Sequence, residues 1–180
     1  MEQQKVNWVF EPSHCKIGFS VRHFGISQTE GFFRKFEGHI NSGNKIDLSD
    51  AGVDLTIDAT SIDTQDQNRD GHLLSADFFN TEKFPTIHFK STRTEVLEPN
   101  MYRMSGDLTM MGITKPVSLD VEFGGILEKD PFGNTKAGFL VTGKINRKDW
   151  GITWNVALDR GGVAVSETVK ISCHIELLRA

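Results

Sequence analysis

Apolar and polar residues alternate with a period of two along most of the chain. Between residues 15 and 23, Ile17, Phe19 and Val21 fall on one face of an extended chain, while Lys16 and Arg22 fall on the other. The same alternation recurs at residues 53–60, 117–123 and 169–177. Strands that bury one face and expose the other give this pattern, which is typical of antiparallel sheets because buried parallel strands are apolar throughout.

The alternating segments and some less regular ones predict about eight strands. The predicted strands cover residues 6–23, 26–40, 52–60, 85–96, 101–110, 115–128, 135–146 and 165–178. Turn-forming residues separate most of them, and no repeat, low-complexity tract or linker interrupts the chain. The sequence therefore predicts a single domain over residues 1–180.

Several predicted strands are long, and residues 26–40 would extend about 50 Å. Closing the sheet on itself removes the exposed edges that such strands would leave, and about eight strands close around space for one small ligand. Pro12 predicts a break in the first segment. A bulge between Gly31 and Phe36 would turn both Phe33 and Phe36 inward. The prediction is an all-β fold, an extended antiparallel barrel of about eight strands.

A short helical segment is predicted between the third and fourth strands, within NRDGHLLSADFFN at residues 68–80. Asp63, Thr64 and Asp66 precede it and offer N-cap side chains. Its charged residues could form a catalytic cluster or anchor an apolar cover, but no nucleophile motif accompanies them. We therefore interpret the segment as a lid or plug, with Arg69 and Asp70 as anchors, rather than as an active site.

Composition favours a dry interior and excludes several functions. The chain has 13 Phe and one Tyr, and Phe has no polar atom to satisfy. These residues could fill the barrel or line a cavity, and the sequence leaves that choice open. A net charge of −4 without a basic run argues against nucleic acid as a partner. Two Cys and six His residues show no metal-ligand spacing, so no metal site is predicted.

No signal sequence or apolar run of ~20 residues is present, so no transmembrane segment is predicted. The chain as written is expected in the cytoplasm, and a removed export signal would give the alternative, the periplasm.

Candidate polar contacts lie near predicted strand ends. His23 continues an inward-facing apolar face, and KINRKDWGI at residues 144–152 ends a strand with Arg147. Arg147 could belong to a cationic rim, although a structural role is the simpler interpretation. Trp150 and Trp154 could seal one end of the barrel with their rings.

Several ordered motifs resemble the YceI-like family of polyisoprenoid-binding or lipid-binding β-barrel proteins. These motifs are WVFEPSH at 8–14 followed by IGFSVRHFGI, GFFRKFEG at 31–38, SIDTQDQNRDGHLLSADFFNTEKFP at 61–85, GDLTMMGITKPVSLDVEFGG at 106–125 and GKINRKDWGI at 143–152. Two residues depart from the family pattern: Glu11 stands where Asp is usual, and Cys15 where Ser is usual. Any hydrogen bond that Ser makes there is expected to be weaker or absent.

The resemblance implies a lipocalin-like barrel whose lumen holds a long apolar chain, such as a polyisoprenoid, an isoprenoid quinone or a fatty-acid-like lipid. The residues expected in the lumen and lid are Phe19, Val21, Phe33, Phe36, Ile57, Leu73, Leu74, Phe78, Phe79, Phe89, Val121 and Phe123. The candidates for head-group contact are Arg22, His23, Arg69, His72 and Arg147.

The expected function is passive binding, as a carrier, storage or stress-related protein, with no cofactor other than the bound lipid. Two alternatives stay open: an enzyme acting on a bound lipid, and a structural or interaction protein with a filled core. A homodimer is an alternative to a monomer.

Overall fold

The computed structural model describes residues 5–43 and 45–180, and within these ranges eleven strands form one sheet in which paired neighbours are antiparallel. The strands are β1 (Val6–Phe10), β2 (Lys16–His23), β3 (Ser27–Phe33), β4 (Phe36–Ser42), β5 (Gly52–Asp58), β6 (Ile62–Asp63), β7 (Thr86–Glu98), β8 (Met101–Met110), β9 (Ile113–Leu127), β10 (Lys136–Asn146) and β11 (Thr168–Arg179). The helices are α1 (Gln67–Leu74) and the 3₁₀ turns η1 (Pro12–His14), η2 (Ala59–Ser61) and η3 (Arg147–Trp150).

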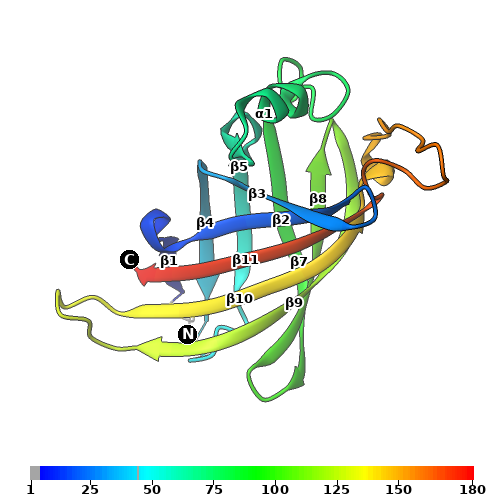
Figure 1. The fold of residues 1–180 in the computed structure, drawn as a ribbon. Coiled ribbons are helices and arrows are strands. Elements are labelled where there is room, and N and C mark those ends of the chain that lie inside the picture. The colour runs from blue at the N-terminus through cyan, green and yellow to red at the C-terminus, as the bar shows by residue number, and fades with distance from the viewer. Residues whose placement is uncertain (1–4, 44) are drawn as a thin grey trace.

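The sheet closes into a barrel because β1 pairs with both β4 and β11. The closed circuit runs β1-β4-β5-β7-β8-β9-β10-β11 and returns to β1, while β2, β3 and β6 continue beyond β11. Figure 1 shows the long strands curving around a common interior, with α1 above one end. The predicted eight-stranded antiparallel barrel is therefore confirmed.

Both N-terminal strands are interrupted at the predicted places. The first segment divides at Pro12, which lacks the N–H of a strand residue and starts the turn η1. The second divides between Phe33, the last residue of β3, and Phe36, the first of β4. These breaks let each segment pair with one set of neighbours in its first half and another in its second.

The predicted helical segment is present as α1, between β6 and β7. The Asp66 carboxylate accepts the backbone N–H of Arg69 at 3.0 Å and caps the first turn. The last turn ends where the Ser75 hydroxyl donates to the His72 carbonyl at 2.6 Å. Within the described part of the chain, no helix combines the length and the apolar character needed to cross a membrane.

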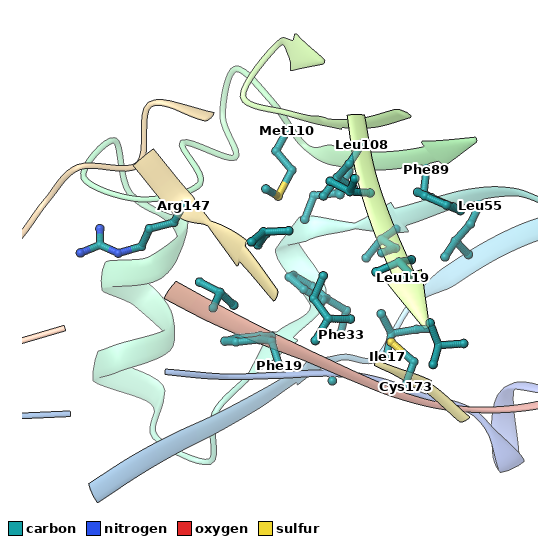
Figure 2. Close-up of a pocket in the computed structure, with 18 of the residues that line it drawn as sticks. Ile17, Phe19, Phe33, Leu55, Phe89, Leu108, Met110, Leu119, Arg147 and Cys173 are labelled. Atoms are coloured by element: carbon teal, nitrogen blue, oxygen red, sulfur yellow. The ribbon is translucent and has the colours of Figure 1, made fainter. Parts of the chain in front are cut away.

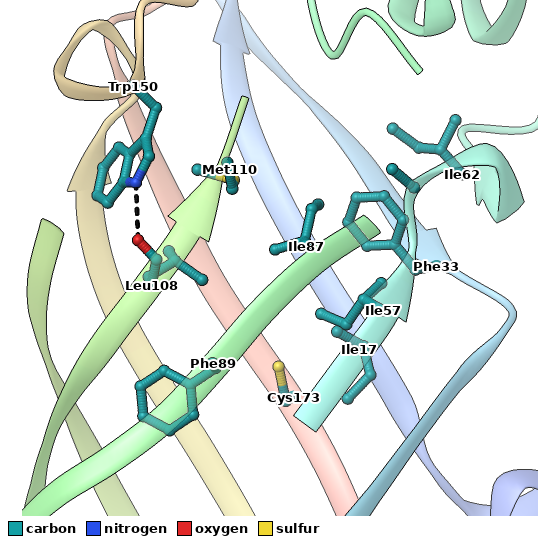
Figure 3. Close-up of a cluster of buried hydrophobic side chains, with 11 residues drawn as sticks. Ile17, Phe33, Ile57, Ile62, Ile87, Phe89, Leu108, Met110, Trp150 and Cys173 are labelled. Atoms are coloured by element: carbon teal, nitrogen blue, oxygen red, sulfur yellow. Dashed lines mark hydrogen bonds between the residues drawn. The ribbon is translucent and has the colours of Figure 1, made fainter. Parts of the chain in front are cut away.

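The buried residues lie on the inner face of the barrel. Figure 3 shows one cluster in which Ile17 and Phe33, partners on the neighbouring strands β2 and β3, lie in the same group as Phe89 of β7. Trp150 is 2% exposed, and its indole N–H donates to the Leu108 carbonyl at 3.0 Å. This bond fixes η3 against β8, so the predicted role of Trp150 in sealing a barrel end agrees with its position.

Candidate functional site

The barrel is hollow. A cavity of about 800 Å³ runs through its interior, and almost every long strand contributes to its largely apolar wall (Figure 2). Cavities of this size accommodate drug-sized or lipid ligands. Eight of the Phe residues line this cavity, so the barrel is not solidly filled, which answers the question that composition left open.

Most of the residues expected in the lumen and lid lie on the cavity wall. Those on the wall are Phe19, Val21, Phe33, Ile57, Leu73, Phe78, Phe79, Phe89 and Val121. Phe19 and Phe33 pack with ring centroids 5.7 Å apart, and Phe79 meets Phe33 edge-on at 5.9 Å. The apolar residues that follow α1 therefore pack directly on the strands below them.

Phe36, Leu74 and Phe123 lie behind the cavity wall. Phe36 is turned against Phe10, edge-on at 5.7 Å, because the break before β4 shifts its position. Leu74 follows Leu73 on a helix, where neighbours diverge by about 100°, so only Leu73 reaches the cavity. Phe123 packs against Phe139, which takes the wall position.

Arg69 and Asp70 anchor the lid through a single residue, Thr64. Arg69 donates from Nε to the Thr64 hydroxyl at 2.8 Å and from Nη2 to its carbonyl at 2.7 Å. The Asp70 carboxylate accepts the backbone N–H and the hydroxyl of Thr64, at 2.9 and 2.5 Å. The anchoring interpretation therefore agrees with the geometry, and Arg69 still borders the cavity.

His72 lies at the edge of the cavity within an aromatic group. Its ring meets Phe78 and Trp154 edge-on, with centroids 5.0 and 4.8 Å away. His72 Nε2 lies 2.8 Å from the Asp77 carboxylate. This group joins α1 to the loop after η3, and we call this end of the barrel, bordered by Arg69, His72 and Trp154, the mouth.

Arg147 is a buried structural residue. Only 4% of it is exposed, and its guanidinium donates to the carbonyls of Ile152, Val165 and Ser166. Figure 2 shows this group directed away from the other cavity residues. Burial lowers the pKa of Arg147, with nearby Glu167 opposing the effect. Its side chain fixes the loop that frames the mouth, as the structural interpretation predicted.

The other two candidates for head-group contact differ because strand residues alternate. His23 faces inward and borders the cavity. Arg22, one position earlier, is exposed on the outer face of β2, outside the cavity lining. The arginine is therefore poorly placed for a ligand in the lumen.

The opposite end of the cavity carries a polar pair that the sequence did not suggest. The Tyr102 hydroxyl donates to the Asp47 carboxylate at 2.7 Å, and both residues border the cavity. Burial, followed by the hydrogen bond to Asp47, raises the pKa of Tyr102 to about 12. Burial also acts on Asp47, but hydrogen bonds from Tyr102 and Ser49 outweigh it and hold the pKa of Asp47 below its ordinary value.

The sequence pattern gives a signal for one residue of this pair, Tyr102, but not for the other, Asp47. Tyr102 shares the inner face of β8 with Met104 and Leu108, so strand periodicity could have placed it. Asp47 lies in the loop between β4 and β5, which has no periodicity to read.

The two cysteines are unpaired and occupy different environments. Cys173 borders the cavity, and burial raises its pKa to about 11, which suppresses the nucleophilic thiolate. Cys15 donates to the Glu176 carbonyl at 3.2 Å, so a contact persists where Ser is usual in the family. Neither thiol has the lowered pKa of a catalytic cysteine.

Outside the cavity, Glu11, His14 and Glu176 bring potential metal-ligand atoms within 4.8 Å of one another. Lys136 lies among them and donates to Glu11 and Glu176, at 2.8 Å in each case. The hydrogen bonds and charges of the two glutamates raise the pKa of Lys136. The ammonium group thus supplies the positive charge that these carboxylates need.

Comparison with known proteins matches this architecture. The model of the YceI-like domain matches residues 8–177. A UPF0312 protein of Staphylococcus aureus is 37% identical over 174 residues, covering 94% of this chain and 96% of the relative. A UPF0312 protein of Staphylococcus epidermidis is 38% identical over 167 residues, covering 93% and 94%.

Solved structures share the fold. The YceI protein of Campylobacter jejuni aligns with a TM-score of 0.74 and 29% identity, over 88% of this chain and 90% of its own. BcnA of Burkholderia cenocepacia aligns at 0.77 with 20% identity, over 93% and 98%. A polyisoprenoid binding domain from Saccharophagus degradans aligns at 0.69 with 12% identity, over 96% and 98%.

Proposed function

The chain belongs to the YceI-like family, and from this premise we propose that it binds a long-chain apolar ligand in its lumen. The ligand class is a polyisoprenoid, an isoprenoid quinone or a fatty-acid-like lipid, and the role is carriage or storage. The observation that carries the proposal is the cavity of about 800 Å³ with its largely apolar wall. The S. degradans domain, described as polyisoprenoid binding, shares this fold.

Burial of hydrocarbon supplies the affinity in this proposal. Each methylene removed from water contributes about 0.8 kcal/mol, so a tail of ten to fifteen carbons contributes about 8–12 kcal/mol before the cost of ordering it. Micromolar or tighter binding then needs no polar anchor. Because the candidate ligands all have hydrocarbon tails, the apolar wall discriminates weakly between them. The polar groups at the two ends of the cavity must therefore provide any selectivity.

The polar residues favour one orientation of the ligand. His23, Arg69 and His72 border the mouth, where hydrogen-bond donors can meet a polar head group. The Asp47 carboxylate borders the far end and repels an anionic group there. We therefore place the head group at the mouth, with the tail directed inward past Phe33 and Phe89.

The proposed function is binding without chemistry on the ligand. Cys173, one potential nucleophile on the cavity wall, is held as a thiol by its raised pKa. Arg69, an obvious polar group of the lid, already donates to Thr64.

Native mass spectrometry of gently purified protein tests the proposal. We expect masses above that of the bare chain. Organic extraction should release the bound lipid and leave protein with the mass of the bare chain. Delipidated protein should then take up added prenyl or acyl chains at one per barrel. A spectrum without ligand, together with no uptake of either kind of chain, would contradict the proposal.

A further inference from the structure

Exposed apolar side chains gather on two neighbouring loops beside the mouth. One is the turn between β2 and β3, and the other follows η3. The exposed fractions are 47% for Phe24, 84% for Ile26, 49% for Val156 and 43% for Val163. We call these four residues the collar.

Main-chain contacts join the two loops into one surface. The backbone N–H of Phe24 donates to the Ala164 carbonyl at 2.9 Å, and His23 forms an isolated bridge with Val165. Ala157 and Val163 form another bridge, which closes the second loop on itself. Figure 1 shows both loops together at the same end of the barrel. The collar is therefore a fixed feature rather than a set of unrelated side chains.

The backbone at Phe24 is unfavourable for its side chain. Phe24 and Gly25 have φ values of 54° and 71°, and the N–H of Ile26 donates to the His23 carbonyl at 3.2 Å. This is the geometry of a type I′ turn, in which Asn, Asp or Gly normally takes the first central position. A bulky residue there is strained, and an exposed Phe gains little from burial. The molecule thus tolerates two costs to present this ring.

The collar continues into the wall of the cavity. Phe24 and Val156 are exposed, yet both also border the cavity. An apolar path therefore leads from the lumen to the outer surface along these two side chains. Residues 24–28 carry no charge. The second loop carries Asp159 and Arg160, which cancel, and Glu167, which pairs with Lys148 of η3 at 2.7 Å.

We propose that the collar docks on the surface of a lipid bilayer and passes the hydrocarbon ligand between bilayer and lumen; this inference rests on the proposed function. A long hydrocarbon chain resides in membranes because water excludes it. A bilayer held against the collar faces the apolar path directly, whereas a protein bound there would cover it. Because the collar is neutral, insertion of apolar side chains drives docking, and zwitterionic lipid suffices. The few side chains involved make the contact transient.

The test compares the protein with the double variant Ile26→Ser/Val163→Ser, whose two substituted side chains belong to the collar but lie outside the cavity lining. Both side chains are exposed, so the variant should retain the fold, which thermal unfolding verifies. Phe132→Ser is the matched control. Phe132 is 88% exposed, but its loop precedes β10, whereas the collar loop follows the other end of that strand.

Co-flotation with phosphatidylcholine vesicles measures docking without a ligand. We expect the protein and Phe132→Ser to float equally, and the double variant to partition about tenfold less. Transfer of a fluorescent prenyl chain from these vesicles should slow by a similar factor. Uptake of the same chain from cyclodextrin should reach the same final occupancy in all three proteins.

Each outcome decides the inference. Equal flotation of the protein and the double variant, including no flotation of either, would overturn it. A dimer that the double variant dissociates, without flotation of either protein, assigns the collar to a second copy and also overturns it. Flotation that depends on the collar, with no uptake from any source, supports docking while the proposed function fails.

Discussion

Arg69 donates two hydrogen bonds to Thr64, one to its side chain at 2.8 Å and one to its carbonyl at 2.7 Å. Thr64 is 4% exposed and follows the short strand β6, so this pair ties the lid to the barrel. A planar guanidinium can make both bonds at once because its donors have a fixed fork geometry. The lid therefore depends on an arginine at this position rather than on positive charge alone.

Arg69→Lys should loosen the lid while leaving the barrel folded. Lysine keeps the charge but loses the fork, and the lost hydrogen bonds of this partly exposed residue are worth about 1–2 kcal/mol. Amide hydrogen exchange in α1 should therefore accelerate about tenfold, and ligand release should quicken with it. Arg103→Lys, which alters an exposed pair with Asp120 on the barrel, is the control. Unchanged exchange in α1 would show that the lid is held elsewhere.

Val121→Trp should shorten the longest chain that the lumen accepts. Val121 is 7% exposed and borders the cavity, so a larger side chain there occupies space that the ligand needs. In a series of prenyl chains, affinity should fall about tenfold or more for the longest and little for the shortest. Glu122→Gln, on the outward-facing neighbour, should leave the series unchanged. A uniform loss across all lengths would point to a disrupted barrel instead.

The strands could be predicted because burial of one face leaves a direct trace in the sequence. The alternation in 169–177 and the break at Pro12 both correspond to observed features. Hollowness leaves no such trace, because Phe19 and Phe89 have the same inward position whether they fill a core or line a cavity. That part of the prediction came from resemblance to a family and needed the structure to support it.

Individual site residues were harder to predict because small geometric changes decide them. Phe36 and Leu74 are apolar and inward-facing, yet a strand break and one helical step place them behind the wall. Asp47 reaches the cavity from a loop, where periodicity gives no guidance. Arg147 illustrates the opposite case, since its charge suggested a ligand although backbone carbonyls already surround it.

Cys173 should report on occupancy of the lumen. In a Cys15→Ser variant it is the remaining thiol, and its pKa of about 11 keeps it protonated at neutral pH. Alkylation at pH 7 should be about a hundredfold slower than for a free cysteine, and faster as pH rises. Saturation with a prenyl chain should slow it further, because the thiol borders the cavity. A rate that ignores the ligand would place the chain away from this wall.

Tyr102 allows the far end of the cavity to be titrated alone, because it is the one tyrosine of the chain. Its phenolate absorbance in the native protein should rise with a midpoint of about 12. Asp47→Asn removes the neighbouring negative charge, so the midpoint should move toward ~10, the value of an unperturbed tyrosine. If the variant titrates like the parent protein, the charge of Asp47 does not act on the phenol.

The same pair predicts how stability depends on pH. The folded-state pKa of Tyr102 is raised, so its contribution is complete below ~10 and is lost as pH rises toward about 12, because the unfolded chain releases that proton first. The folded-state pKa of Asp47 is lowered, so its contribution is present above ~3.9 and is lost as pH falls below that value. Urea unfolding of the protein and Tyr102→Phe across both ranges should therefore show the variant with a weaker pH dependence at each end. Parallel curves would mean that the hydrogen bond between Tyr102 and Asp47 does not couple these protonation states to folding.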